Sequence, residues 1–66
     1  MKNTIKIKRA VKNITQEDLA KAIGVSRQTI NAMEAGKYVP STVLALKIAK
    51  YFNKKVEDIF ELEADD

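Results

Sequence analysis

Residues 15–30 read TQEDLAKAIGVSRQTI, and this segment predicts two short helices joined by a tight turn. Thr15 is a favourable N-cap residue, and Asp18 lies three residues further on, at the spacing of a capping box. The first helix is therefore expected to begin next to Thr15. Its apolar residues recur at helical spacing and mark a buried face, formed by Leu19, Ala20 and Ile23.

The connection between these two helices is the most informative local feature. Gly24 suits the left-handed conformation that ends many helices, and Ser26 is a favourable N-cap for the next helix. So short a connection is typical of a helix-turn-helix, in which Ala20 lets the helices approach and Ile30 packs back on the first of them. A plain αα-hairpin has a similar connection, so this geometry alone leaves both interpretations open.

Apolar periodicity predicts helices on both sides of this segment. A helix over about residues 4–12 has one face formed by Ile7, Val11 and Ile14, although the alternation of residues 5–8 leaves its start ambiguous. The helix after Ser26 extends to about residue 35. A further helix, capped by Ser41 and ending near residue 52, is apolar nearly all round, so we expect it to pack against two surfaces. A last helical turn contains Val56, Ile59 and Phe60.

The C-terminal tail, residues 60–66, begins with the alternating pattern Phe-Glu-Leu-Glu, which favours a short strand. A strand needs a partner for its backbone, and the extended start of the chain at residues 2–4 is the natural candidate. A frayed tail is the alternative.

Charge is divided sharply along the chain. All 12 Lys and Arg residues lie between Lys2 and Lys55, where only three acids occur, so this part carries +9. The last ten residues carry −6, which brings the net charge to +3. A basic body suits a polyanionic partner, although a lysine-rich solubilising surface is the simpler interpretation.

The composition excludes several classes of protein. A chain of 66 residues is expected to form one domain with a small core. It has no cysteine and no histidine, so we expect no disulfide, no metal site and no cofactor. Without histidine to activate a serine, an enzyme is not expected. No signal peptide or membrane-spanning run is present, which favours a cytoplasmic protein.

The outward face of residues 27–35 carries side chains that suit base recognition. Arg27, Gln28 and Asn31 end in planar hydrogen-bonding groups; in the major groove, Arg pairs with guanine and Gln or Asn with adenine. The first turn lacks the acids that a helix dipole favours, which suits an approaching phosphate. An ordinary polar surface is the alternative. Because this face bears a cation and amides but no anion, we favour double-stranded DNA as the partner.

Several motifs together resemble the helix-turn-helix of phage Cro and lambda-repressor-like proteins. They are QEDLA at 16–20, IGVSRQTI at 23–30, EAGK at 34–37, LALKIA at 44–49 and VEDIF at 56–60. The length and tail resemble a compact prokaryotic subgroup that includes a dimeric repressor of a cytolysin operon. The resemblance implies an all-α, five-helix domain over residues 1–66, with the helix-turn-helix at about 15–35. It also implies a small two-stranded antiparallel sheet formed by the N- and C-terminal segments.

The resemblance further implies a homodimeric transcriptional regulator, expected to be a repressor, that binds a pseudo-palindromic operator. Its helix around residues 27–35 would enter the major groove, with Arg27, Gln28 and Asn31 facing base edges. The DNA backbone would be contacted by Gln16, Ser26, Thr29, Lys37 and Tyr38. Candidates for the dimer interface are Phe52, Phe60 and Leu62, although the sequence leaves open whether they belong to the core instead.

The chain departs from this family's pattern at three positions. Lys8 stands where an aliphatic residue is common and Asn13 where glycine is common, so the packing and the end of the first helix are expected to differ. Ala32 stands where many relatives carry a longer polar residue. Fewer bases are then expected to be recognised, unless Ala32 contacts a thymine methyl group instead. A protein-interaction module, such as the antitoxin of a toxin–antitoxin pair, is the alternative function. No small-molecule effector is expected, because the length leaves no ligand domain.

Overall fold

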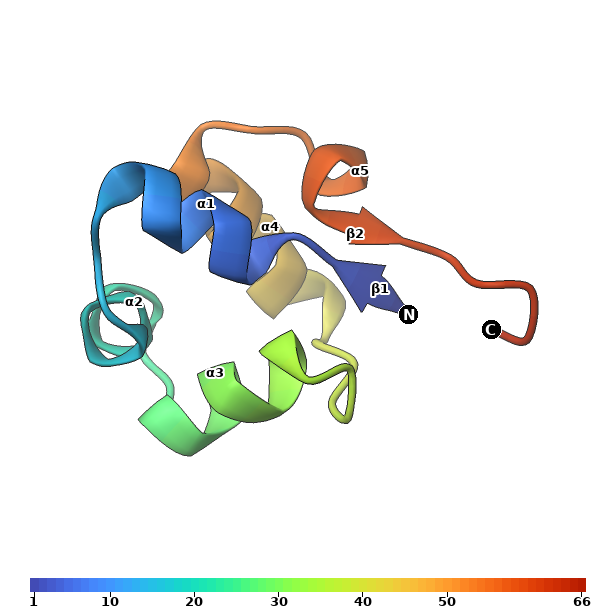
Figure 1. The fold of residues 1–66 in the computed structure, drawn as a ribbon, viewed down its shortest axis with the longest axis horizontal. Coiled ribbons are helices and arrows are strands. Elements are labelled where there is room, and N and C mark those ends of the chain that lie inside the picture. The colour runs from blue at the N-terminus through green and yellow to red at the C-terminus, as the bar shows by residue number, and fades with distance from the viewer.

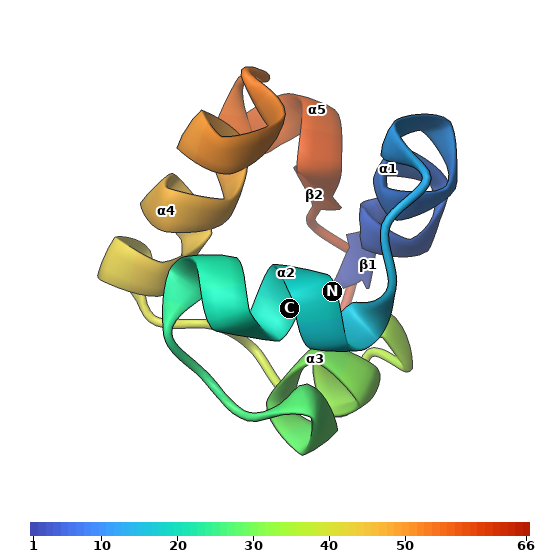
Figure 2. The same cartoon turned by 90° about the vertical axis from the view of Figure 1, so that its left-hand side faces the viewer.

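The computed structural model describes residues 1–66 as five helices and two short strands. In chain order the elements are β1 (Lys2–Asn3), α1 (Ile5–Lys12), α2 (Gln16–Ile23), α3 (Arg27–Glu34), α4 (Thr42–Phe52), α5 (Val56–Ile59) and β2 (Phe60–Glu61). Figure 2 shows α1 and α4 on opposite sides of the molecule, with α2 and α3 together beneath them. The predicted all-α fold with a small terminal sheet is confirmed. None of the helices combines the length and the apolar character needed to cross a membrane.

The predicted helix ends are confirmed at the level of individual hydrogen bonds. Thr15 Oγ1 accepts from the Asp18 amide at 3.0 Å, and Asp18 Oδ2 accepts from the Thr15 amide at 3.0 Å, which completes the capping box. Ser26 and Ser41 cap α3 and α4 with a single bond each, from the amides of Thr29 and Leu44 to the serine Oγ. Gly24 ends α2 with a φ of 78°, a conformation that costs glycine little.

Asparagine rather than glycine ends α1. Asn13 adopts a φ of 57°, in the left-handed region that asparagine tolerates better than most residues. Its amide donates to carbonyl groups of the last turn of α1, so the helix ends here without a glycine. Asn53 ends α4 with the same geometry.

The two strands pair the ends of the chain. β1 is antiparallel to β2, with Lys2 opposite Glu61 and Asn3 opposite Phe60 (Figure 1). The predicted strand is therefore confirmed in preference to a tail that frays from Phe60, although it stops at Glu61. The Asn3 side chain donates to the Met33 carbonyl at 2.7 Å, which ties β1 to the end of α3.

The core lies where all five helices meet. Eleven apolar residues are buried, and the largest fully buried side chains are Ile5, Leu19, Ile30, Met33, Ile48 and Ile59. Ala20 of α2 is buried in the core, and Val25 packs against the core from the turn. The α2–α3 pair therefore has the packing that the helix-turn-helix interpretation predicted.

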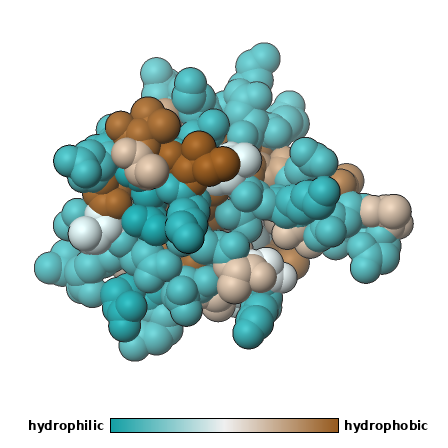
Figure 3. Space-filling model, in the orientation of Figure 1, coloured by the Kyte–Doolittle hydropathy of each residue, from teal (hydrophilic) through white to brown (hydrophobic).

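The buried face predicted for α1 is wrong. The side chains of Ile7 and Val11 are 61% and 82% exposed, and the space-filling view shows this apolar patch over α1 (Figure 3). Ile5 and Arg9 point inward instead, while Ile14 is half-buried beyond the helix. The two pairs have the same four-residue spacing, and the structure buries the face with Ile5, on which Arg9 forms an ion pair with Glu34 of α3.

This assignment of the α1 faces predicts unequal effects of two identical substitutions. Ile5→Ala removes a fully buried side chain and is expected to lower the free energy of unfolding by about 2–5 kcal/mol. Ile7→Ala, in the same helix, is expected to change it by less than about 0.5 kcal/mol because the side chain is exposed. Urea unfolding followed by circular dichroism measures both. Equal losses would show that Ile7 belongs to the core.

Candidate nucleic-acid interface

Helix α3 lies at the surface with two chemically distinct faces. Ile30 and Met33 are fully buried in the core. The three predicted base-reading residues, Arg27, Gln28 and Asn31, are all exposed on the other face. The tight α2–α3 turn produces this arrangement, because Gly24 ends α2 and Ser26 caps α3 only two residues later. The structure thus brings the three side chains together on one exposed helix, at the lower edge of Figure 1.

The leading end of α3 carries hydroxyl groups and no acid. Ser26 Oγ accepts from the Thr29 amide at 3.2 Å and lies 3.0 Å from Thr29 Oγ1. The first turn contains no Asp or Glu, so the positive end of the helix dipole is not neutralised by a side chain. Hydroxyl groups and free amides at a positive helix end are suitable donors to a phosphate.

Lys37 and Tyr38 lie in the loop after α3, and both are exposed. Gly36 precedes them with a φ of 75°, which turns the chain away from the helix axis. The loop therefore presents a cation and a phenol beyond the far end of α3. Together with Ser26 and Thr29, these residues lie along α3 and its two ends.

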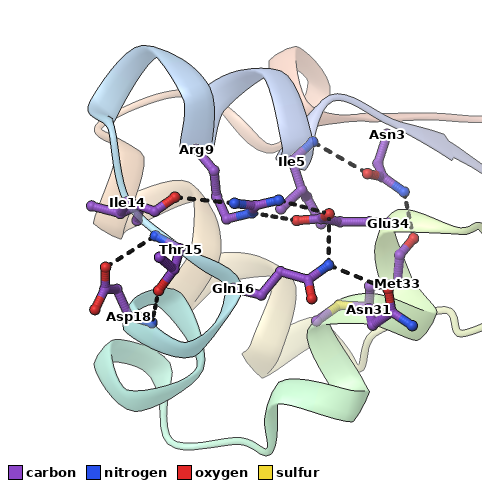
Figure 4. Close-up of polar contacts among 10 residues, drawn as sticks. All are labelled: Asn3, Ile5, Arg9, Ile14, Thr15, Gln16, Asp18, Asn31, Met33 and Glu34. Carbon is purple, nitrogen blue, oxygen red and sulfur yellow. Dashed lines mark hydrogen bonds and ion pairs between the residues drawn. The ribbon is translucent and has the colours of Figure 1, made fainter.

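Gln16 has partners that sequence reasoning missed. It is the first residue of α2, and its side-chain Nε2 donates to Glu34 Oε1 at 3.1 Å and to Asn31 Oδ1 at 3.3 Å (Figure 4). The predicted phosphate ligand is therefore joined to α3 by its side chain. Its half-buried position reflects these bonds.

The centre of this polar network is an ion pair between α1 and α3. Arg9 Nε lies 2.6 Å from Glu34 Oε2, and Arg9 Nη2 donates to Glu34 Oε1 at 3.1 Å. The third guanidinium nitrogen, Nη1, donates to the Ile14 carbonyl at 3.0 Å. The side chains are only 14% and 7% exposed. Such two-point contacts are among the strongest that an arginine makes with a carboxylate.

A signal for this ion pair was present in the sequence. Glu34 lies four residues after Ile30, and Arg9 lies four residues after Ile5. Each charge is therefore on the same helical face as a fully buried isoleucine. The signal was incomplete, because spacing alone does not say whether the Ile5–Arg9 face or the Ile7–Val11 face of α1 is buried.

The ion pair also determines the ionisation of Glu34. Burial by itself raises the pKa of this carboxyl group. The hydrogen bonds from Arg9 and Gln16 and the nearby positive charges lower the pKa by more than burial raises it, so the pKa lies below its ordinary value of 4.5. The hydrogen bond to Glu34 likewise raises the pKa of Arg9. Both groups are therefore held in their charged forms.

The candidate dimer residues occupy different environments. Phe60 is buried in the core, Phe52 is half-buried against it, and Leu62 is exposed. Sequence reasoning did not single out Val39, Val43 and Leu46, which are more than half exposed. Next to them lies an open, largely apolar groove of about 320 Å³, to which Val39, Leu46 and Phe60 contribute. No residue of α3 lines this groove.

Comparison with known proteins agrees with this geometry. A helix-turn-helix family model matches residues 5–59. A protein of Methanocaldococcus jannaschii, named as an HTH-type transcriptional regulator, is 64% identical over 66 residues, which cover 100% of both chains. A Bacillus subtilis protein of the same description is 52% identical over 65 residues, 98% of each chain. One from Archaeoglobus fulgidus is 53% identical over 66 residues, 100% of this chain and 93% of that protein.

The Arg9–Glu34 pair predicts a pH-dependent effect of Glu34→Gln. Because the folded-state pKa of Glu34 is lowered, its carboxylate stabilises the fold above pH 4.5, and this contribution is lost as the pH falls through the lowered pKa. At pH 7 the variant leaves a partly buried guanidinium without its counter-charge, at an expected cost of about 1–3 kcal/mol. Urea unfolding at neutral and acidic pH measures the difference between the variant and the wild type.

The difference should become smaller at acidic pH, where the wild-type carboxyl group is also neutral. Glu17→Gln is the matched control, because Glu17 is exposed in the first turn of α2. It is expected to cost less than about 1 kcal/mol at either pH. A Glu34→Gln effect that does not change with pH would contradict the assignment.

Proposed function

We propose a specific role for this chain, which belongs to the helix-turn-helix (Cro/C1-type) family of DNA-binding transcriptional regulators: it binds a pseudo-palindromic operator as a homodimer and represses transcription. The observation that supports this proposal is the division of α3 into a buried apolar face and an exposed face of Arg27, Gln28 and Asn31. Repression follows where the operator overlaps a promoter. The family regulates transcription by binding DNA and is not a family of enzymes.

In the proposed complex, α3 enters the major groove and recognises base edges. The Arg27 guanidinium has two parallel donors that match guanine O6 and N7, and the Gln28 amide matches adenine N6 and N7. Ala32, half-buried on α3, has a methyl side chain and cannot form a hydrogen bond with a base. Base selection therefore depends mainly on the three exposed polar side chains.

Phosphate contacts supply the remaining affinity in this proposal. They come from Gln16 at the start of α2, Ser26 and Thr29 at the start of α3, and Lys37 and Tyr38 beyond its end. Helix starts have backbone N–H groups without partners inside the helix, and these lie at Gln16 for α2 and just after the turn for α3. Contacts of this kind position the protein on DNA, and they make the affinity strongly dependent on salt.

The homodimer is proposed to form through α4 and the loop before it. Val39, Val43 and Leu46 are exposed beside the apolar groove, and Phe60 contributes to the groove from the core. Covering them with a second copy contributes about 25 cal/mol for each Å² of apolar surface buried. Because no residue of α3 lines the groove, a second copy seated there leaves both α3 helices free. A two-fold dimer would then contact half-sites about 34 Å apart.

The proposed division between base and phosphate contacts predicts different effects of two substitutions. Arg27→Ala is expected to lower affinity for the selected operator by about 1–3 kcal/mol and to relax the preference at one base position. Lys37→Ala is expected to lower the affinity for all DNA sequences by a similar factor and to reduce the salt dependence of binding. The operator is obtained by selection from a random DNA pool, which should yield a two-fold symmetric consensus.

Binding curves on the consensus and on single-base variants then compare the two proteins. An Arg27→Ala variant that weakens every sequence equally would contradict base recognition by Arg27. Purification with an unrelated small polypeptide, without retardation of any DNA, would favour the protein-interaction alternative.

The proposed dimer surface predicts that Leu46→Asp produces a monomer. A carboxylate in the apolar contact would have to be desolvated when the second copy binds. Sedimentation velocity should show one species of about half the wild-type mass, and operator affinity should fall at least about tenfold. Val11→Asp is the control, because Val11 is an exposed apolar residue on α1, 82% exposed against 55% for Leu46. A Leu46→Asp protein that remains dimeric while the control dissociates would place the interface on α1.

A further inference from the structure

We propose that Glu34 and Gln16 fix the side-chain amide of Asn31 so that α3 presents a hydrogen-bond donor there, and that they thereby determine which base Asn31 selects. This inference rests on the proposed function, in which Asn31 faces a base edge. It assigns to the two residues a positioning role, which acts on DNA through Asn31.

The first step fixes the orientation of the Gln16 amide. Glu34 is ionised, its side chain is only 7% exposed, and both of its oxygens accept hydrogen bonds from Arg9. Glu34 Oε1 also accepts from Gln16 at 3.1 Å. A carboxylate has no hydrogen to donate, so only the NH₂ group of Gln16, and not its carbonyl oxygen, can face it. The Arg9–Glu34 pair therefore excludes the flipped amide of Gln16.

The second step concerns the Asn31 amide, whose orientation is fixed by that of Gln16. The Gln16 NH₂ group has two hydrogens; one is directed to Glu34, and the other is available to Asn31 Oδ1, which lies 3.3 Å away. Figure 4 shows Gln16 lying between Glu34 and Asn31. Because a donor faces it, Asn31 turns its carbonyl oxygen toward α2. Its NH₂ group is then left for a ligand on the exposed face of α3.

The third step concerns the base that such a group selects. An asparagine that pairs with adenine uses its oxygen and its nitrogen together, on adenine N6 and N7. An asparagine that offers only NH₂ finds two acceptors on guanine, N7 and O6, and only one on adenine, N7, or on thymine, O4. We therefore expect the position contacted by Asn31 to be guanine rather than the adenine that residue type alone favours, because the N6 amino group of adenine offers the Asn31 NH₂ group no acceptor.

The same geometry changes the expected role of the Gln16 side chain. Both hydrogens of its NH₂ group are directed to protein acceptors, and its remaining carbonyl oxygen cannot donate to a phosphate. A phosphate contact at Gln16 would then come from its backbone N–H at the start of α2. Loss of the side chain is thus expected to change selectivity at one base more than overall affinity.

The test compares Gln16→Met with wild type on matched operators. Methionine keeps the length of the side chain and leaves the Arg9–Glu34 pair in place, so the thermal unfolding temperature serves as a check of folding. Operators carrying guanine or adenine at the Asn31-dependent position, first located with Asn31→Ala, are titrated with both proteins. Wild type should prefer guanine by about fivefold or more, and Gln16→Met by less than about twofold.

A second variant reverses the donor. Asn31→Asp keeps the acceptor for Gln16 but replaces the outward NH₂ group with an oxygen. It should lose the preference for guanine and favour cytosine, whose N4 donates in the major groove. This variant tests the proposal even if Gln16→Met unfolds.

The outcomes separate this inference from the proposed function. If Asn31→Ala changes no base preference, the proposed role of Asn31 is wrong and the inference falls with it. If Asn31→Ala removes a preference for adenine, Asn31 contacts DNA as proposed but its amide is not fixed as a donor. If Gln16→Met weakens all operators equally and keeps the guanine preference, the Gln16 side chain is a phosphate ligand and the inference is wrong.

Discussion

The ion pair between Arg9 and Glu34 is the interaction on which the arrangement of the helices depends. It joins α1 to the end of α3, and the same guanidinium contacts the carbonyl of Ile14 in the connection to α2. A charge buried without its partner would be costly, so α1 and α3 cannot separate or rotate freely while both groups are ionised. In a chain with a small apolar core and no disulfide, this polar contact fixes how α3 is presented at the surface.

The elements of the fold were predictable because their signals are local. The capping box at Thr15, the serine caps of α3 and α4 and the left-handed Gly24 each involve residues within three or four positions of one another. The short sheet was also within reach of sequence reasoning. Only the two ends of the chain had extended character, so each was the natural partner of the other.

Contacts between elements were harder to predict. On α1, the pairs Ile5–Arg9 and Ile7–Val11 have identical spacing, and periodicity favoured the wrong face. The buried face depends on a partner 25 residues away in the sequence. The hydrogen bonds of Gln16 to α3 could not be inferred for the same reason. The exposed apolar residues of α4 were foreseen only as a general excess of hydrophobicity, without the groove beside them.

The two faces of α3 have a consequence for how paralogous regulators diverge. The side chains that hold the helix in place, Ile30 and Met33, are separate from those of Arg27 and Gln28, which lie on the exposed face. After gene duplication, one copy can therefore accumulate changes at these outer positions and acquire new target promoters without loss of stability. Asn31 is less free to change, because its amide is hydrogen-bonded to Gln16 and any replacement must suit that neighbour.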